Sequence, residues 1–190
     1  MPKVSDQHRA ERRRQILDGA RTAFARHGYE GATVNRLEAE IGLSRGAIFS
    51  YFPSKWAIFY ALAQEDQERI FQLILDEGYG AVIRVMAEEN PDWLGVYFEL
   101  IRKLRTDLDL RNEWSNRTPE LNQRVTERFA QLQERGEFRR DLSVDAIGTF
   151  LGLVMDGVAV HVTAGYPVDT EPLLKLVSAA ISPQSRSPLV

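Results

Sequence analysis

The residues whose types could do chemistry are concentrated between Thr33 and Lys55, in the stretch TVNRLEAEIGLSRGAIFSYFPSK. Small, basic, aromatic and hydroxyl side chains follow one another there at helical spacing. Small residues let a helix approach base edges, arginine can donate two hydrogen bonds to guanine, and an aromatic edge can touch the thymine methyl group. A phenol and an ammonium can hold phosphates, which sets the register on DNA without reading its sequence. The chemistry that this stretch favours is therefore recognition of duplex DNA.

The elements that must position these side chains are two short helices and a tight turn. Leu37 and Ile41 give the first helix an apolar stripe, and Gly42 ends it because a reversing chain needs a left-handed residue. Thr33 can cap the first helix and Ser44 the second. The pattern predicts a helix-turn-helix, whose second helix enters the major groove. An ordinary helical hairpin would share this local pattern.

The exposed face of the second helix should carry the groups that read bases. At helical spacing these are Ser44, Arg45, Gly46, Phe49 and Ser50. Tyr51 and Lys55 come directly afterwards, where their side chains could hold phosphates.

A second basic group, Arg12, Arg13 and Arg14, opens a helix predicted from Arg9 to His27. Positive charge is disfavoured at the start of a helix by the helix dipole. The triplet therefore indicates another partner, most simply backbone phosphates, with a solvated basic face as the alternative.

The charge of the chain is divided unevenly, although its net value is only −3. Residues 1–55 hold ten Lys or Arg against six Asp or Glu, whereas residues 56–190 hold 14 against 21. A basic head on an acidic body is the asymmetry expected when only one end of a chain meets phosphate.

The N-terminal part of the chain resembles the TetR family of bacterial one-component regulators. The resemblance rests on an amphipathic helix ending FARHGYEGATV, then GLSRGAIFSYFPSK and a long further helix. By position, Thr33, Tyr51 and Lys55 match the phosphate-contacting residues of the family, and Arg45, Gly46, Phe49 and Ser50 match its recognition helix. Glu38 departs from the pattern, because the family usually has a small residue there. The resemblance implies a homodimeric repressor that binds an inverted-repeat operator and is released by a small-molecule effector.

Pattern and resemblance together predict an all-α protein, with a three-helix DNA-binding domain joined through a long helix to a helical ligand-binding and dimerisation domain. The expected boundaries are residues 1–53 for the DNA-binding domain, 54–182 for the second domain and 183–190 for a disordered tail. The long helix should run from Ser54 to Glu77, and one continuous helix is expected from Asp92 to Trp114. A shared helical body of this kind suits mechanical coupling between sites.

The segment from Ser143 to Gly165 is apolar on two faces, so both faces must be covered. A second subunit is the natural cover in a chain of this size, and the family resemblance implies a four-helix bundle across a two-fold axis. The residues expected at this dimer interface are Phe150, Leu153, Val154, Gly157, Val158, Val160 and His161.

Nothing in the sequence predicts catalysis, a cofactor or a metal site. The chain has no cysteine, and its three histidines are isolated. No nucleophile with a base, Gly-rich phosphate loop or zinc-binding helix motif is present. No segment approaches the roughly 20 apolar residues of a membrane span, and no apolar leader is seen, so a cytoplasmic protein is expected.

The effector is predicted only through polar groups inside mostly apolar helices. These candidates are Tyr60, Tyr97, Glu99, Arg102 and Asp156, although Glu99 and Arg102 stand three residues apart and could simply pair with each other. HGYEGATV, RLEAEIGLSRGAIF and IRKLRTD are similar to the actinobacterial branch that contains the aconitase repressor, which implies a tricarboxylate with a metal ion as effector. The segment LLKLVSAAI offers no acid or arginine for such a ligand, and a hydrophobic or amphipathic ligand fits the apolar helices equally well.

Two other classes of function stay open at this point. One is a helical protein-interaction module without specific DNA binding. The other is a peripheral membrane protein that uses its basic first helix, although the apolar face of that helix is mostly alanine and weak for insertion.

Overall fold

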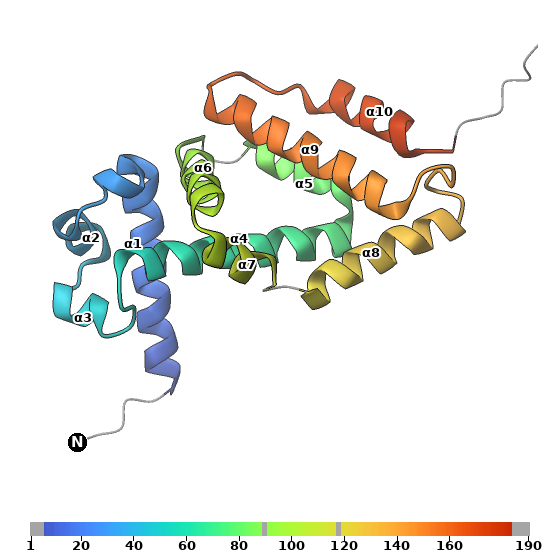
Figure 1. Ribbon diagram of the computed structural model, residues 1–190. Helices are drawn as coiled ribbons and strands as arrows, with labels where there is room; N and C mark the ends of the chain where they lie inside the picture. The colour runs from blue at the N-terminus through green and yellow to red at the C-terminus, as the bar shows by residue number, and fades with distance from the viewer. Residues whose placement is uncertain (1–5, 89–90, 117–118, 184–190) are drawn as a thin grey trace, which may run out of the picture. The chain divides into compact units, whose positions relative to one another are not determined.

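The computed structural model describes residues 6–88, 91–116 and 119–183, which form helices with no strand among them. The all-α prediction is therefore confirmed (Figure 1). The chain divides into two compact units, the first within residues 1–67 and 92–106 and the second within residues 68–91 and 107–190. The functional boundaries at residues 53 and 182 stay predictions, because a compact unit is not a functional domain, and the tail from residue 184 lies outside the described residues.

The first unit contains the predicted DNA reader and one helix from much later in the chain. Its helices are α1 (Asp6–Gly31), α2 (Val34–Ile41), α3 (Arg45–Phe49), the first part of α4 (Lys55–Glu77) and α6 (Pro91–Thr106). Its core is closed by apolar side chains that are almost wholly buried, including Ile16, Leu17, Phe24, Leu37, Ile48, Phe59 and Leu62. These residues recur at helical spacing, which is why the sequence pattern located the helices.

The first helix begins earlier than predicted, at Asp6, so the dipole argument for the arginine triplet is wrong. Only the first turn of a helix has backbone N–H groups without an acceptor in the helix. Arg12, Arg13 and Arg14 lie beyond that turn. Gly28 interrupts α1 with a φ of 66°, a left-handed conformation that glycine adopts without a Cβ penalty. The chain then makes one more turn to Gly31 before α2.

The second unit is built around two helices that pack against each other. It holds the rest of α4 together with α5 (Tyr79–Glu88), α7 (Leu108–Ser115), α8 (Pro119–Glu134), α9 (Val144–Thr163) and α10 (Thr170–Ile181). α5 packs on α9, α8 packs on α9 and α10 packs on α5. The core of this unit includes Val82, Ile83, Phe129, Ile147, Leu151 and Val158.

The predicted continuous helix from Asp92 to Trp114 is wrong, because the chain breaks at Asp107. The Asp107 carboxylate accepts the Leu110 N–H at 2.9 Å and caps α7 as a separate helix. An aspartate inside a helical pattern competes for backbone N–H groups, and here that local hydrogen bond overrides the apolar periodicity.

The apolar helix α9 also corrects the expectation about membrane spans. By length and composition alone, α9 is the one helix among the described residues that could cross a membrane. α9 meets this criterion because it is apolar on two faces, one buried and one exposed. Ile147 and Leu151 are buried, whereas Phe150, Leu153 and Val160 are 38, 65 and 49% exposed.

Candidate nucleic-acid interface

The turn between α2 and α3 is held by caps on both of its helices. The Thr33 hydroxyl accepts the Arg36 N–H at 3.5 Å, and the Ser44 hydroxyl accepts the Ala47 N–H at 3.4 Å. Gly42 has a φ of 73° and ends α2 in the left-handed conformation. The predicted helix-turn-helix is therefore present with the caps that the sequence indicated.

The α2 helix packs on α1 at very short range. A Cβ built on Gly19 would lie 2.7 Å from the Ile41 Cα, so no larger residue fits at position 19 without moving the backbone. The Gln15 amide donates to the Ile41 carbonyl at 2.9 Å and closes the end of α2. The Arg26–Glu40 ion pair at 2.7 Å adds a further tie between α1 and α2. Sequence reasoning missed Gly19, because a glycine inside a helix reveals no contact by itself.

The predicted base-reading residues lie together on α3 and its two ends. Ser44, Arg45, Gly46 and Ser50 are exposed, and Phe49 is half-buried. The Arg45 guanidinium carbon lies 5.9 Å from the centroid of the Phe49 ring. A Cβ added to Gly46 would meet nothing within 4 Å, so this point of α3 can be approached closely.

Glu38 is a contact residue that the sequence showed only as a departure from a pattern. Its carboxylate accepts the Arg45 N–H at 2.6 Å, across the turn from α2 to the first residue of α3. Charge-assisted hydrogen bonds of this length are stronger than neutral ones. The only signal in the sequence was the spacing. Glu38 stands seven residues before Arg45, the first residue of α3, whose backbone N–H has no acceptor within its own helix.

The three residues expected to hold phosphates have different surroundings. Thr33 is exposed, and Tyr51 is half-buried directly after α3. The Lys55 ammonium instead donates to the Tyr29 carbonyl at 2.7 Å and lies 4.3 Å from the centroid of the Tyr29 ring. An ammonium has three N–H donors, so this bond leaves capacity for an anion.

Two members of the arginine triplet are bonded within the chain. The Arg12 guanidinium donates to the Gln15 side chain at 2.8 Å. Arg13 pairs with Glu65 at 3.0 Å and lies 5.5 Å from the centroid of the Phe52 ring. Arg14 is exposed. The surfaces of Arg13 and Glu65 stay largely open to solvent, so this pair contributes little to stability.

The backbone N–H and carbonyl of Tyr29 join α6 to the start of α4. Both carboxylate oxygens of Glu99 lie 2.9 Å from the Tyr29 N–H, and the Tyr29 carbonyl accepts from Lys55. A Cβ on Gly28 would lie 3.1 Å from the Glu99 carboxylate, so the glycine kink is what admits the acid. Burial, then the charges of Glu30 and Glu99, raise the pKa of the Tyr29 phenol.

The Tyr29 ring belongs to an aromatic cluster formed by Phe24, Tyr29, Trp56, Phe59 and Tyr60. The Trp56 ring stacks on Tyr60 with centroids 5.9 Å apart. Lys103 of α6 places its ammonium 4.8 Å from the Trp56 ring centroid and 5.7 Å from that of Tyr29. α6 is therefore attached to α1 and α4 through one acid and one cation.

The predicted effector residues are not assembled within one unit. Tyr60, Tyr97, Glu99 and Arg102 belong to the first unit, and Asp156 belongs to the second. The expected pairing of Glu99 with Arg102 is wrong, because Glu99 bonds the Tyr29 N–H and Arg102 approaches Glu30 at 3.9 Å. A kinked backbone with a free N–H is the stronger partner for Glu99, and the sequence did not reveal that the two would meet.

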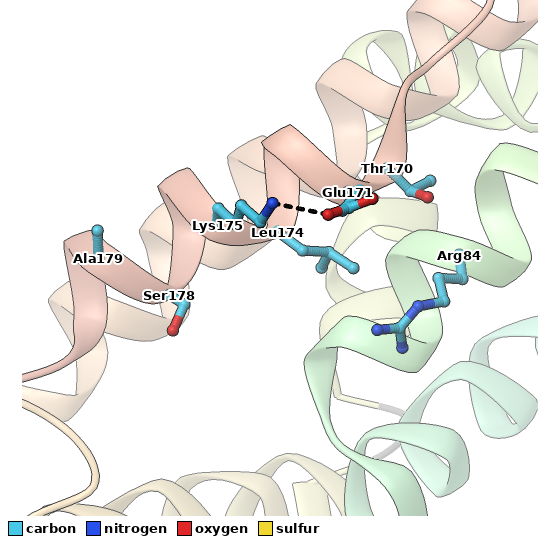
Figure 2. A pocket seen from close by; sticks show the side chains of 7 residues that line it. All are labelled: Arg84, Thr170, Glu171, Leu174, Lys175, Ser178 and Ala179. Atoms are coloured by element: carbon cyan, nitrogen blue, oxygen red, sulfur yellow. Dashed lines mark hydrogen bonds and ion pairs between the residues drawn. The ribbon is translucent and has the colours of Figure 1, made fainter.

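The second unit contains an open hollow of about 570 Å³ between α5 and α10 (Figure 2). Its lining residues are Arg84, Thr170, Glu171, Leu174, Lys175, Ser178 and Ala179. Lys175 and Glu171 pair at 2.6 Å along α10, and Figure 2 shows Arg84 on the facing helix. None of the predicted effector residues lines this hollow. Among the described residues, no group of three or more His, Asp or Glu could hold a metal ion.

The predicted dimer residues divide between the two faces of α9. Phe150, Leu153, Gly157, Val160 and His161 are exposed, and Val154 is half-buried. Val158 is the exception, because it is only 4% exposed and belongs to the core of its own chain. On α10, Leu176 adds an apolar side chain that is 70% exposed.

Two family descriptions together match most of the chain. Residues 16–62 match the bacterial regulatory proteins of the tetR family. Residues 81–184 match the C-terminal domain of BetI-type transcriptional repressors.

Curated proteins give the same family, and solved structures share the fold. The chain is 46% identical over 167 residues to the HTH-type transcriptional repressor Rv1474c of Mycobacterium tuberculosis, covering 87% of this chain and 89% of that protein. It is 41% identical over 184 residues to the HTH-type transcriptional repressor AcnR of Corynebacterium diphtheriae, covering 95% and 97%. The structure of Salmonella enterica GusR aligns with a TM-score of 0.72 at 20% identity, over 94% of this chain and 98% of that one, which shows a shared fold.

Proposed function

Since this chain belongs to the TetR family of bacterial transcriptional repressors, we propose that it acts as a homodimer which binds an inverted-repeat operator and leaves it when a small molecule binds. The observation that carries the proposal is the face of α3. Arg45, Gly46 and Ser50 stand exposed beside Phe49, on a helix fixed by a capped turn. Such a helix presents donors and a flat apolar edge to the major groove.

The proposed contacts divide into two kinds. Ser44, Arg45, Gly46, Phe49 and Ser50 would meet base edges, whereas Thr33, Tyr51 and Lys55 would hold phosphates. The arginines at positions 12, 13 and 14 are proposed as outlying phosphate contacts. Arg14 is the most available, because Arg12 bonds the Gln15 side chain and Arg13 pairs with Glu65.

A homodimer accounts for the apolar surface of the second unit. Phe150, Leu153 and Val160 of α9 and Leu176 of α10 are large, apolar and between 38 and 70% exposed. Phe150, Leu153 and Val160 share one face of α9 at helical spacing, and exposed apolar surface of this kind usually marks a protein interface. A two-fold interface would present two α3 helices to successive major grooves, about 34–36 Å apart on an inverted repeat.

Release by an effector requires a link between α6 and the residues proposed to contact DNA. The backbone of Tyr29 supplies one, because Glu99 of α6 accepts its N–H and Lys55 donates to its carbonyl. A ligand that displaces α6 would free the Tyr29 N–H, let this backbone move and so change the position of Lys55. Such a ligand shifts the population only as far as it prefers the displaced state.

The hollow between α5 and α10 is one candidate place for an effector. Arg84 and Lys175 face it beside Glu171, so a ligand with an anionic group is the chemistry that it suits. The described residues offer no cluster that would hold a metal ion alone. A metal bound together with a tricarboxylate would need the ligand to supply most of its coordination.

The proposal is tested by selecting DNA from a random duplex pool with the purified protein and measuring binding across a salt series. The expected result is one inverted-repeat motif, bound by two chains, whose affinity falls steeply with salt. Recovery of no motif, with equal binding to all sequences, would leave a helical interaction module as the better account.

A further inference from the structure

The helix that reads DNA begins at an N–H group held by a carboxylate of the preceding helix. The Glu38 carboxylate accepts the Arg45 N–H at 2.6 Å, whereas the Ser44 hydroxyl accepts the Ala47 N–H at the longer distance of 3.4 Å. Glu38 therefore provides the shorter of the two side-chain contacts at the start of α3.

This contact fixes the residue best placed to read a base. Arg45 is the first residue of α3, and its guanidinium lies beside the Phe49 ring. Recognition helices contact base edges with their N-terminal residues. Glu38 thus holds the backbone of Arg45 while Phe49 holds its side chain.

The same carboxylate puts a negative charge where DNA would arrive. An acid beside phosphates weakens binding to every sequence, because backbone affinity is electrostatic and does not depend on sequence. The operator bears the same penalty but also gains the base contact of Arg45, so its net affinity stays high while that of random DNA is low.

We propose that Glu38 is a positioning and specificity-determining residue, which orients Arg45 through its backbone N–H and lowers the affinity for all DNA through its charge. This inference rests on the proposed role of α3 as the base-reading helix. It assigns a function to the residue that departs from the family pattern.

Three substitutions separate the two effects. Glu38→Gln keeps an oxygen acceptor of the same reach and removes the charge. Glu38→Asp keeps the charge and withdraws the acceptor by one methylene group. Glu38→Ala removes both. Glu40→Gln is the matched control, because it removes the same charge two residues along α2 from an acid that pairs with Arg26 instead of α3.

The measurement is fluorescence anisotropy on the duplex that the wild-type protein selects and on a shuffled duplex, with melting curves to confirm folding. Glu38→Gln should bind shuffled DNA about threefold to tenfold more tightly. Its gain on the operator should be smaller, because a neutral amide oxygen holds the Arg45 N–H less strongly than a carboxylate does. Glu38→Asp should lose about tenfold on the operator without gaining on shuffled DNA. Glu38→Ala should show both changes, and its base preference should weaken at the position that Arg45 reads.

Folded variants that bind both duplexes as the wild type does would overturn the proposal. So would equal gains on shuffled DNA for Glu38→Gln and Glu40→Gln, since the effect would then be one of net charge. If the wild type selects no motif, the DNA-reading role of α3 fails first, and that outcome is distinguishable because it is seen before any variant is made.

Discussion

At the scale of single residues, the structure separates side chains that face solvent on α3 from those whose hydrogen bonds are already made within the chain. Arg45 is exposed: its backbone N–H is held by Glu38, and its guanidinium lies over the Phe49 ring. Lys55 reaches inward to the Tyr29 carbonyl. Tyr51 lies between them in the chain and is half-buried. These three residues therefore make different predictions for binding.

Replacing Arg45 with Ala should change which sequence is preferred. A bidentate arginine contact with guanine contributes about 1–3 kcal/mol of discrimination, so operator affinity should fall by about tenfold or more while binding to shuffled DNA changes little. Anisotropy on both duplexes measures this, and an equal loss on the two would contradict a base-reading role.

Replacing Tyr51 with Phe should weaken all DNA binding alike. The substitution removes one hydroxyl and leaves the ring, so a loss of about threefold to tenfold is expected on operator and shuffled duplexes together. Selection from a random pool should return the wild-type motif. A changed motif would move Tyr51 into the base-reading group.

Tyr79 predicts how the stability of the second unit depends on pH. Burial, and then the charge of Asp156, raise the pKa of this phenol above its usual value of about 10. A raised pKa in the folded state means that stability is fully present below pH 10 and is lost as the pH rises through the folded pKa. The free energy of unfolding, measured with denaturant, should therefore fall in the wild type as the pH rises above 10. In Tyr79→Phe this fall should be smaller. An unchanged alkaline slope in Tyr79→Phe would exclude this cause.

At the scale of elements, the sequence predicted the helix-turn-helix and α4 better than it predicted the remaining helices. Capping residues and periodic apolar positions located α2, α3 and α4, because their information lies within a few residues. The break at Asp107, the early start of α1 and the meeting of Glu99 with Tyr29 depend on competition between local hydrogen bonds or on contacts distant in sequence. Periodicity does not contain that information.

The same distinction holds inside the candidate site. Helical spacing predicted an exposed face on α3, and Ser44, Arg45, Gly46 and Ser50 are exposed, whereas Phe49 is half-buried. The Glu38 contact was missed, because its partner is a backbone N–H across the turn. The inward direction of Lys55 was missed for a similar reason, since its acceptor is the carbonyl of a residue in α1.

The close packing of α1 on α2 predicts that Gly19→Ala destabilises the first unit. The new methyl group would lie 2.7 Å from the Ile41 Cα, which is backbone and cannot turn aside. Overpacking of this kind costs about 1–3 kcal/mol, observed as a lower melting temperature. Gly148→Ala in α9 is the control, because its new methyl group would be 3.9 Å from Phe129, an ordinary contact. Equal melting temperatures for wild type and Gly19→Ala would show that α2 can shift freely.

At the scale of the whole molecule, a basic N-terminal part, an acidic remainder and one uncovered apolar face are consistent with a dimer that meets DNA at one end. The exposed apolar residues of α9 and α10 are what should hold two chains together.

Leu153→Glu should dissociate the dimer, because it places a charge at a position that the partner would bury. Sedimentation velocity reports the change. Leu108→Glu is the matched control, since Leu108 is 61% exposed but lies on α7. Dissociation by both variants, or by neither, would place the interface elsewhere.

The most direct test of a dimeric operator reader is the stoichiometry of the complex with the duplex that the protein selects. Sedimentation equilibrium of the labelled duplex with increasing protein should reach two chains per inverted repeat. A duplex carrying only one half-site should bind far more weakly, and Leu153→Glu should lose most of its affinity for the full site. Saturation at one chain per duplex, or equal affinity for half and full sites, would contradict the account.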